Sequence, residues 1–194
     1  MASVVFAEDR NLYMIKKLVE TLCEASEVDS HDVRISSISS ATKTAKSQII
    51  VINNLQRSMD LSYALNSLVA GGTLILDADE RNYTELSFSK PVRLITYGYN
   101  PISTLRATYV TNGTYTSLRC HIQRSFFSIE GHLLEPQEFI LHTAQTGLPA
   151  KDVLAAVSVA LLCGVDVPNI TAISNSSEEL SFPLFQGQSQ MAVH

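Results

Sequence analysis

The chain has 194 residues, of which 45% are hydrophobic and 17% charged, and its formal net charge at pH 7 is −5. This length fits one domain of ordinary size, and the composition excludes a disordered chain. The lack of a basic tract argues against a nucleic-acid-binding surface, and no apolar run is long enough to span a membrane.

Short apolar runs alternate with helical patterns over the first hundred residues. The spacing predicts strands at 3–7, 32–38, 49–52, 73–76 and 92–96, and helices at 12–25 and 60–69. Residues 49–52 are apolar and β-branched, which is typical of a parallel strand covered on both faces. The helix at 60–69 is expected to end at Ala70-Gly71-Gly72, because glycine commonly follows a helix. This alternation predicts an α/β fold with a mostly parallel sheet flanked by helices.

Between about 104 and 143 the pattern changes to strands with little helix between them. We predict strands at 105–110, 116–123, 125–129 and 138–142. Asn112-Gly113 is a hairpin signal and Glu130-Gly131 a weaker one, so these strands indicate an antiparallel β subdomain or an antiparallel extension of the sheet.

The last predicted helix, 151–163, is rich in Ala, Leu and Val, follows Pro149 and ends at Gly164. We expect it to pack on the sheet. These elements predict one domain over 1–174, followed by a polar tail, 175–194, that is partly flexible.

Redox and targeting features indicate a cytoplasmic protein. The chain begins without a basic leader or a long apolar stretch, so we expect no secretory signal. Its three cysteines (Cys23, Cys120 and Cys163) are widely spaced and odd in number, which predicts reduced, buried or half-buried thiols. The five histidines are scattered without metal-ligand spacing, so no metal site is expected. No pattern of a catalytic nucleophile is present either, and no catalytic residue is assigned.

The loop after the first predicted strand is the place where an α/β domain would cradle phosphates. This loop, formed by Ala7, Glu8, Asp9, Arg10 and Asn11, contains no glycine and no lysine and carries two carboxylates. P-loop chemistry has no residues to perform it here. We expect Asp9 to cap the helix that begins near Leu12 instead.

Polar residues at the carboxyl ends of the strands, together with two at a helix start, form the candidate ligand site. Those at the strand ends are Asn53, Asn54, Asp77, Asp79 and Tyr97, and those at the helix start are Lys151 and Asp152. The carboxylates that follow the strand at 73–76 could bind Mg²⁺, but we favour a solvated loop in which Arg81 pairs with them. For Tyr97, Tyr99 and Tyr109 we favour packing roles with a wet hydroxyl.

The order of these pieces resembles the central domain of the Mur ligases and their folylpolyglutamate synthase relatives. The resemblance rests on Ile49-Ile-Val-Ile-Asn-Asn54, Gly71-Gly-Thr-Leu-Ile-Leu-Asp-Ala-Asp-Glu80, Val92-Arg-Leu-Ile-Thr-Tyr-Gly98, Asp152-Val-Leu-Ala-Ala156 and Gly164-Val-Asp-Val-Pro168. These enzymes join an amino acid to a growing chain using ATP. The resemblance implies a bacterial cytoplasmic protein linked to cell-wall or folate-type ligase chemistry, with ATP and Mg²⁺ as the cofactors of such a reaction.

The departures from this family are equally informative. The family's P-loop, gly-thr-asn-gly-lys-thr, falls near residues 7–12, and every functional position is changed. The family's his-asn-x-x-asn segment falls at 148–152, where Asp152 alone echoes the final asparagine. The magnesium-binding glutamate and the carbamylated lysine have no recognisable counterpart. We also expect the domain to stand alone, without the family's amino-terminal and third domains.

Three hypotheses follow from this combination. The first is a pseudoenzyme, a non-catalytic binding, interaction or regulatory module that needs no cofactor and docks on a protein partner or self-associates into a homo-oligomer. The second is a ligand-binding protein or enzyme with altered chemistry at the retained site. The third is one subunit of a split ATP-dependent ligase.

Overall fold

The computed structural model describes residues 2–6, 11–26, 28, 33–37, 46–52, 65–80, 88–112, 115–142 and 148–175. The elements in chain order are β1 (Ala2–Phe6), α1 (Leu12–Glu24), β2 (Val33–Ser37), β3 (Ser47–Ile52), β4 (Leu68–Asp77), β5 (Arg93–Gly98), β6 (Leu105–Asn112), β7 (Tyr115–Ile122), β8 (Phe126–Phe127), β9 (Leu133–Leu134), β10 (Gln137–His142), α3 (Ala150–Leu162) and α4 (Val167–Asn175).

An eight-stranded sheet with the order β10-β7-β6-β5-β4-β3-β1-β2 forms the centre of the fold. The strands from β2 to β6 pair in parallel, whereas β7 is antiparallel to both β6 and β10. The prediction of a mostly parallel sheet with an antiparallel extension is confirmed. The β6–β7 ladder continues to the pair Asn112 and Tyr115, as the hairpin signal indicated, although the two residues of the turn lie outside the described residues.

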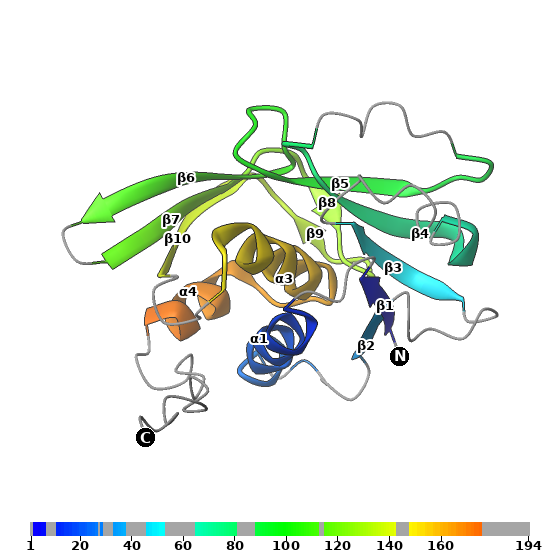
Figure 1. Ribbon diagram of the computed structural model, residues 1–194, viewed down its shortest axis with the longest axis horizontal. Helices are drawn as coiled ribbons and strands as arrows, with labels where there is room; N and C mark the ends of the chain where they lie inside the picture. The colour runs from blue at the N-terminus through cyan, green and yellow to red at the C-terminus, as the bar shows by residue number, and fades with distance from the viewer. Residues whose placement is uncertain are drawn as a thin grey trace, which may run out of the picture.

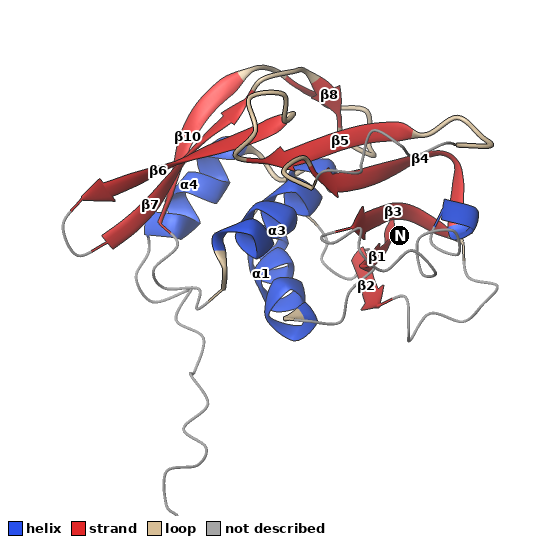
Figure 2. Cartoon of the chain, turned by 45° about the horizontal axis from the view of Figure 1, so that its top comes forward, coloured by secondary structure: helices blue, strands red, loops and turns tan. Residues whose placement is uncertain are grey.

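The described helices α1, α3 and α4 lie on one face of the sheet (Figure 1, Figure 2). On α1 the apolar side chains recur at helical spacing, so a single stripe is buried, formed by Ile15, Leu18, Val19, Leu22 and Cys23. On α3 every residue from Val153 to Leu162 is buried, because this helix lies between α1 and the sheet. The opposite face of β1, β3 and β4 carries a second, smaller apolar cluster that includes Val5, Ile50 and Leu74.

Helix α3 ends at Gly164, as predicted. Gly164 has a φ of +102°, and the N–H of Val165 donates to the carbonyl of Ala160 at 3.0 Å. This is the glycine-terminated motif that satisfies the last carbonyls of a helix. The N–H of Ile129, in the turn between β8 and β9, donates to the carbonyl of Leu162 at 2.9 Å. The small β8–β9 hairpin therefore fixes the end of α3.

The predicted helix at 60–69 is wrong at its carboxyl end. Residues 65–67 are helical, but β4 begins at Leu68 and runs through both glycines, while residues 60–64 lie outside the described residues. Gly71 has a φ of +75° and its N–H donates to Pro91, and a Cβ on Gly72 would lie 2.8 Å from Cδ1 of Leu68. The β3–β4 register shifts at this point. The glycines form an irregularity of the strand instead of ending a helix.

The structure also differs from the predicted elements at the start of α1 and adds two elements. Helix α1 is preceded by Asn11, which has a φ of 59° and makes no capping bond, while Asp9 lies outside the described residues. Strand β9 and helix α4 were not predicted. The tail beyond Asn175 also lies outside the described residues. No helix in the described ranges is long and apolar enough to cross a membrane.

Candidate functional site

The carboxyl ends of β4 and β5 meet the beginning of α3. The parallel register places Asp77, the last residue of β4, beside Tyr97 of β5. Lys151 lies in the first turn of α3, and its side chain reaches across to this edge. The structure therefore brings together four of the candidate residues, Asp77, Asp79, Tyr97 and Lys151.

Lys151 is held between two carboxylates. Its Nζ lies 2.7 Å from Oδ2 of Asp77 and 3.3 Å from Oδ2 of Asp79. The side chain of Asp77 is only 2% exposed, whereas those of Asp79 and Lys151 are 20% and 37% exposed. Burial lowers the pKa of Lys151, but the hydrogen bond to Asp77 and the charges of Asp77 and Asp79 together outweigh it and raise that pKa. The ammonium group is thus charged at neutral pH and paired with both carboxylates.

Asp79 also organises the loop that follows β5. Its carboxylate accepts hydrogen bonds from the N–H groups of Tyr99, at 3.1 Å, and Asn100, at 2.8 Å. Its own N–H donates to Oδ1 of Asp77 at 2.9 Å. Gly98 permits this approach, because its φ is +142° and a Cβ there would lie 2.9 Å from Oδ2 of Asp79. The preference for a solvated loop paired with Arg81 is wrong for Asp77, which is buried and pairs with Lys151; Arg81 lies outside the described residues.

A second contact joins the beginnings of two helices at this edge. Nδ2 of Asn11, immediately before α1, donates to Oδ2 of Asp152 in the first turn of α3 at 2.7 Å. Asn11 stands in the left-handed conformation, with a φ of 59°. The end of the first loop is therefore fixed to α3 by a side chain.

Three tyrosines at this edge have different environments. Tyr97 is fully buried; burial first, and then the charges of Asp77, Asp152, Glu80 and Asp79, raise its pKa. Its hydroxyl is not wet, so that part of the expectation is wrong. Tyr99 and Tyr109 stack with ring centroids 5.1 Å apart, and their hydroxyl oxygens lie 2.5 Å apart. Tyr109 remains 57% exposed.

The remaining candidates are not all placed. Asn53, Asn54, Glu8, Asp9 and Arg10 lie outside the described residues. Sequence reasoning missed Gly98 and Asn100; a glycine directly after a strand was the available signal for Gly98. Over the ranges that the structure describes, no group of three or more His, Cys, Asp or Glu side chains is arranged for a metal ion.

All three cysteines are free and buried, as predicted. Burial is the main cause that raises the pKa of each thiol, to about 11 for Cys23 and about 12 for Cys163. These groups are therefore protonated and shielded at neutral pH, which makes them poor nucleophiles.

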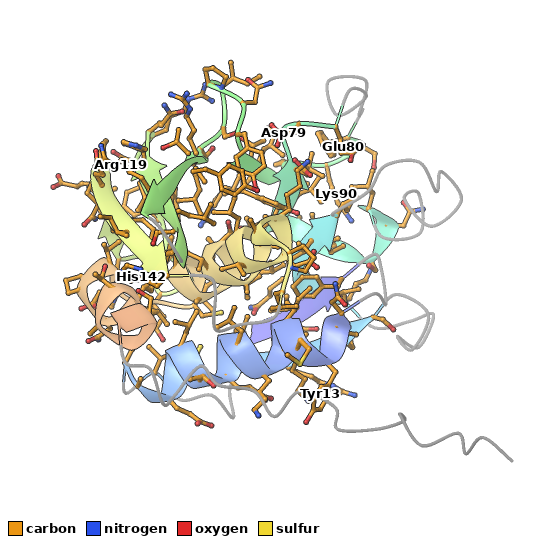
Figure 3. The ribbon with its side chains drawn as sticks, turned by 60° about the vertical axis from the view of Figure 1, so that its left-hand side comes forward. Tyr13, Asp79, Glu80, Lys90, Arg119 and His142 are labelled. Carbon is orange, nitrogen blue, oxygen red and sulfur yellow. The ribbon has the colours of Figure 1, made fainter. Side chains whose placement is uncertain are left out.

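The charge at this edge is predominantly negative. Asp77, Asp79, Glu80 and Asp152 all act on the pKa of Tyr97, and Lys151 is the cation that pairs with two of them. Figure 3 shows Asp79 and Glu80 on neighbouring positions at this edge. A polyphosphate needs positive charge and free N–H donors, so the described part of this site is poorly suited to one.

Comparison with solved structures identifies the fold. The chain is similar to the UDP-N-acetylmuramoylalanyl-D-glutamyl-2,6-diaminopimelate–D-alanyl-D-alanyl ligase of Acinetobacter baumannii, with a TM-score of 0.59 and 11% identity over 98% of this chain and 47% of that one. It has a Mur ligase-like fold. A murein peptide ligase of Psychrobacter arcticus gives a TM-score of 0.60 at 11% identity, covering 93% of this chain and 46% of that one.

A folylpolyglutamate synthetase has a similar fold. The folylpolyglutamate synthetase of Lactobacillus casei gives a TM-score of 0.53 at 7% identity, over 91% of this chain and 62% of that one. The chain spans about half the length of the Mur ligases that it matches. No protein-family model matches the sequence, and no curated protein matches it. Such low identities support the fold, and function must be argued from the site.

Proposed function

We propose that this chain is a non-catalytic Mur ligase-like domain that acts as a binding, interaction or regulatory module in the bacterial cytoplasm. The observation that carries the proposal is the pairing of Lys151 with Asp77 and Asp79. A lysine that serves phosphoryl transfer must be free to contact the transferred phosphate, and carboxylates that serve it must be free to bind Mg²⁺. Here the ammonium group of Lys151 and the carboxylates of Asp77 and Asp79 pair with each other.

The sequence of the first loop supports the same proposal. Residues 7–11 contain neither the glycines that let a backbone approach phosphates nor a lysine. Asn11 is engaged with Asp152. Acyl-phosphate formation needs cradled phosphates, a held Mg²⁺ and an acid positioned in line, and these residues supply none of the three in recognisable form.

Calorimetric titration of the chain with ATP and Mg²⁺ tests this proposal. We expect no saturable heat, or a dissociation constant in the millimolar range. A micromolar dissociation constant would overturn the proposal and favour a split ligase whose second subunit completes the site. Lys151→Met, titrated in parallel, shows whether any binding uses the ammonium group, and a thermal melt of each protein establishes that it is folded.

A second candidate function is ligand binding with altered chemistry at this edge, and the exposed Tyr109 ring favours it. Tyr99 and Tyr109 present a stacked aromatic surface next to Asp79, whose carboxylate holds the Tyr99 backbone. Aromatic faces of this kind bind flat rings and cations. Tyr109→Ala should abolish the binding of any small molecule found to use this surface, and Tyr13→Ala, which removes a distant exposed tyrosine, should not.

A further inference from the structure

Strand β10 forms one edge of the eight-stranded sheet. No strand within the described ranges pairs with its outer side. An open edge presents unpaired N–H and C=O groups, which is a template for pairing with another strand. The six residues from Gln137 to His142 make this edge long enough for a specific pairing.

The ladder shows which residues direct their backbone groups outward. Ile140 lies opposite Arg119 of β7. Oγ1 of Thr108, on β6, donates to the carbonyl of Arg119 at 3.5 Å, so that carbonyl faces β6. Because the N–H and C=O of one strand residue point to the same side, Arg119 bonds to β6, and its pair with Ile140 is a non-bonded one. The N–H and C=O of Ile140 therefore face away from β7. Bonded and non-bonded pairs alternate along an antiparallel ladder, so the same groups of Glu138 and His142 also face away from β7. A hydroxyl of α4, Ser174 Oγ, reaches the Ile140 carbonyl at 3.4 Å, which agrees with this orientation.

The side chains of β10 are complementary to a second copy of the same strand. An antiparallel pair centred on Ile140 sets Ile140 against Ile140 of the second copy, and Phe139 against Leu141. The same register sets Glu138 against His142. Ile140 is 37% exposed in the single chain. Apolar cross-strand pairs stabilise a sheet, and an imidazole N–H of His142 can donate to the carboxylate of Glu138.

The polar groups of this edge keep atoms available for such a pairing. Ser117 Oγ lies 2.8 Å from Nδ1 of His142, so this contact within the chain uses one of the two ring nitrogens. Glu138 contacts Arg119 and His121 in its own chain at 3.2 and 3.3 Å, yet its side chain stays 49% exposed. Figure 3 shows Arg119 and His142 on the same side of the molecule, away from Asp79.

We propose that the chain forms a homodimer in which the two β10 strands pair antiparallel about Ile140 and join the sheets of both copies. This inference rests on the interaction module proposed above and names its partner. Its test is a molecular mass, so it can fail while the nucleotide titration supports a non-catalytic domain, and the reverse also holds.

The mass of the full chain in solution, measured by light scattering over a concentration series, is the primary test. We expect twice 21.3 kDa at high concentration. Ile140→Pro removes an outward N–H that has no acceptor among the described residues, and edge strands tolerate proline. This variant should remain folded and become a monomer. A monomeric wild type at every concentration, or a dimer that survives Ile140→Pro, would overturn the proposal.

Two further measurements test the register. Glu138→Lys should weaken the dimer. The double variant Glu138→His with His142→Glu should dimerise as the wild type does, because it exchanges the two residues and each pair is again complementary. Ile140→Cys should cross-link rapidly with a short bis-maleimide, whereas Tyr13→Cys, on a 72% exposed position of α1, should not. A chain ending at Asn175 tests whether residues 176–194 or a second copy covers the outer side of β10. If the wild type is a monomer and this shorter chain dimerises, residues 176–194 cover the edge and the proposal fails.

Discussion

Gly98→Ala tests whether the approach of Asp79 to the backbone after β5 holds this edge together. The substitution has two costs that the structure separates. A φ of +142° strains a residue that has a Cβ, by about 1 kcal/mol or more. The new Cβ would also lie 2.9 Å from Oδ2 of Asp79 and displace a carboxylate that accepts hydrogen bonds from two backbone N–H groups.

The magnitude follows from these two terms. Hydrogen bonds to a charged acceptor contribute about 1.5–3 kcal/mol each, and we take about 1 kcal/mol for each bond here because Asp79 is 20% exposed. With the backbone strain, the loss in the free energy of unfolding is about 3 kcal/mol. For a chain of this size each kcal/mol lowers the Tm by about 2–4 °C, so we expect a decrease of about 6–12 °C in a thermal melt.

Gly131→Ala is the matched control. Gly131 has a φ of +87° and no atom within 4 Å of the position of a Cβ, so it carries the backbone strain without the contact. Its expected cost is about 1 kcal/mol. In the double variant Gly98→Ala with Asp79→Ala the clash is absent. Its loss in the free energy of unfolding should therefore be smaller than the sum of the losses of the two single variants. If Gly98→Ala lowers the Tm no more than Gly131→Ala does, the role assigned to Asp79 is refuted.

Two other predictions concern protonation. Lys151→Met should lower the free energy of unfolding at pH 7 by about 1–2 kcal/mol, a value reduced from that of a buried pair because Lys151 is 37% exposed. Pairing raises the pKa of Lys151, so the wild type should keep this advantage in stability below the ordinary lysine pKa of about 10.4 and lose it as the pH rises further. Denaturant titrations at several pH values would show this change. A difference in stability that stays the same at high pH would contradict the ion pair. The thiols of Cys23 and Cys163 should resist alkylation at pH 8 in the folded chain and react once denaturant is added, as mass spectrometry would report; rapid labelling of the native chain would contradict their burial.

The elements that could be predicted are those whose signal is local. Helix α1 was found from one apolar stripe, and β3 from a β-branched run, because each pattern reports a face that the element itself buries. Helix α4 was missed, although its signal was present. Oδ1 of Asp166 accepts the N–H of Asn169 at 2.9 Å, and Pro168 falls in the first turn, which is a common beginning of a helix.

The beginning of β4 could not be predicted, because its cause lies elsewhere in the chain. Glycine after an apolar helical pattern is a general stop signal, and nothing in residues 68–72 distinguishes a helix end from an irregular strand. The distinction depends on Pro91, which accepts the N–H of Gly71, and on Lys90, whose Nζ donates to the carbonyl of Leu68. Both partners lie about twenty residues away.

The candidate site shows the same division between local and distant causes. An Asp-x-Asp sequence after a parallel strand predicts carboxylates at a ligand-binding edge, and that prediction needs no distant residue. What these carboxylates do depends on the cation that reaches them. A metal ion would make them part of a reaction, whereas a lysine from a helix 74 positions away makes them part of the fold. Because the same two aspartates fit either role, the proposal of a non-catalytic domain rests on their pairing with Lys151.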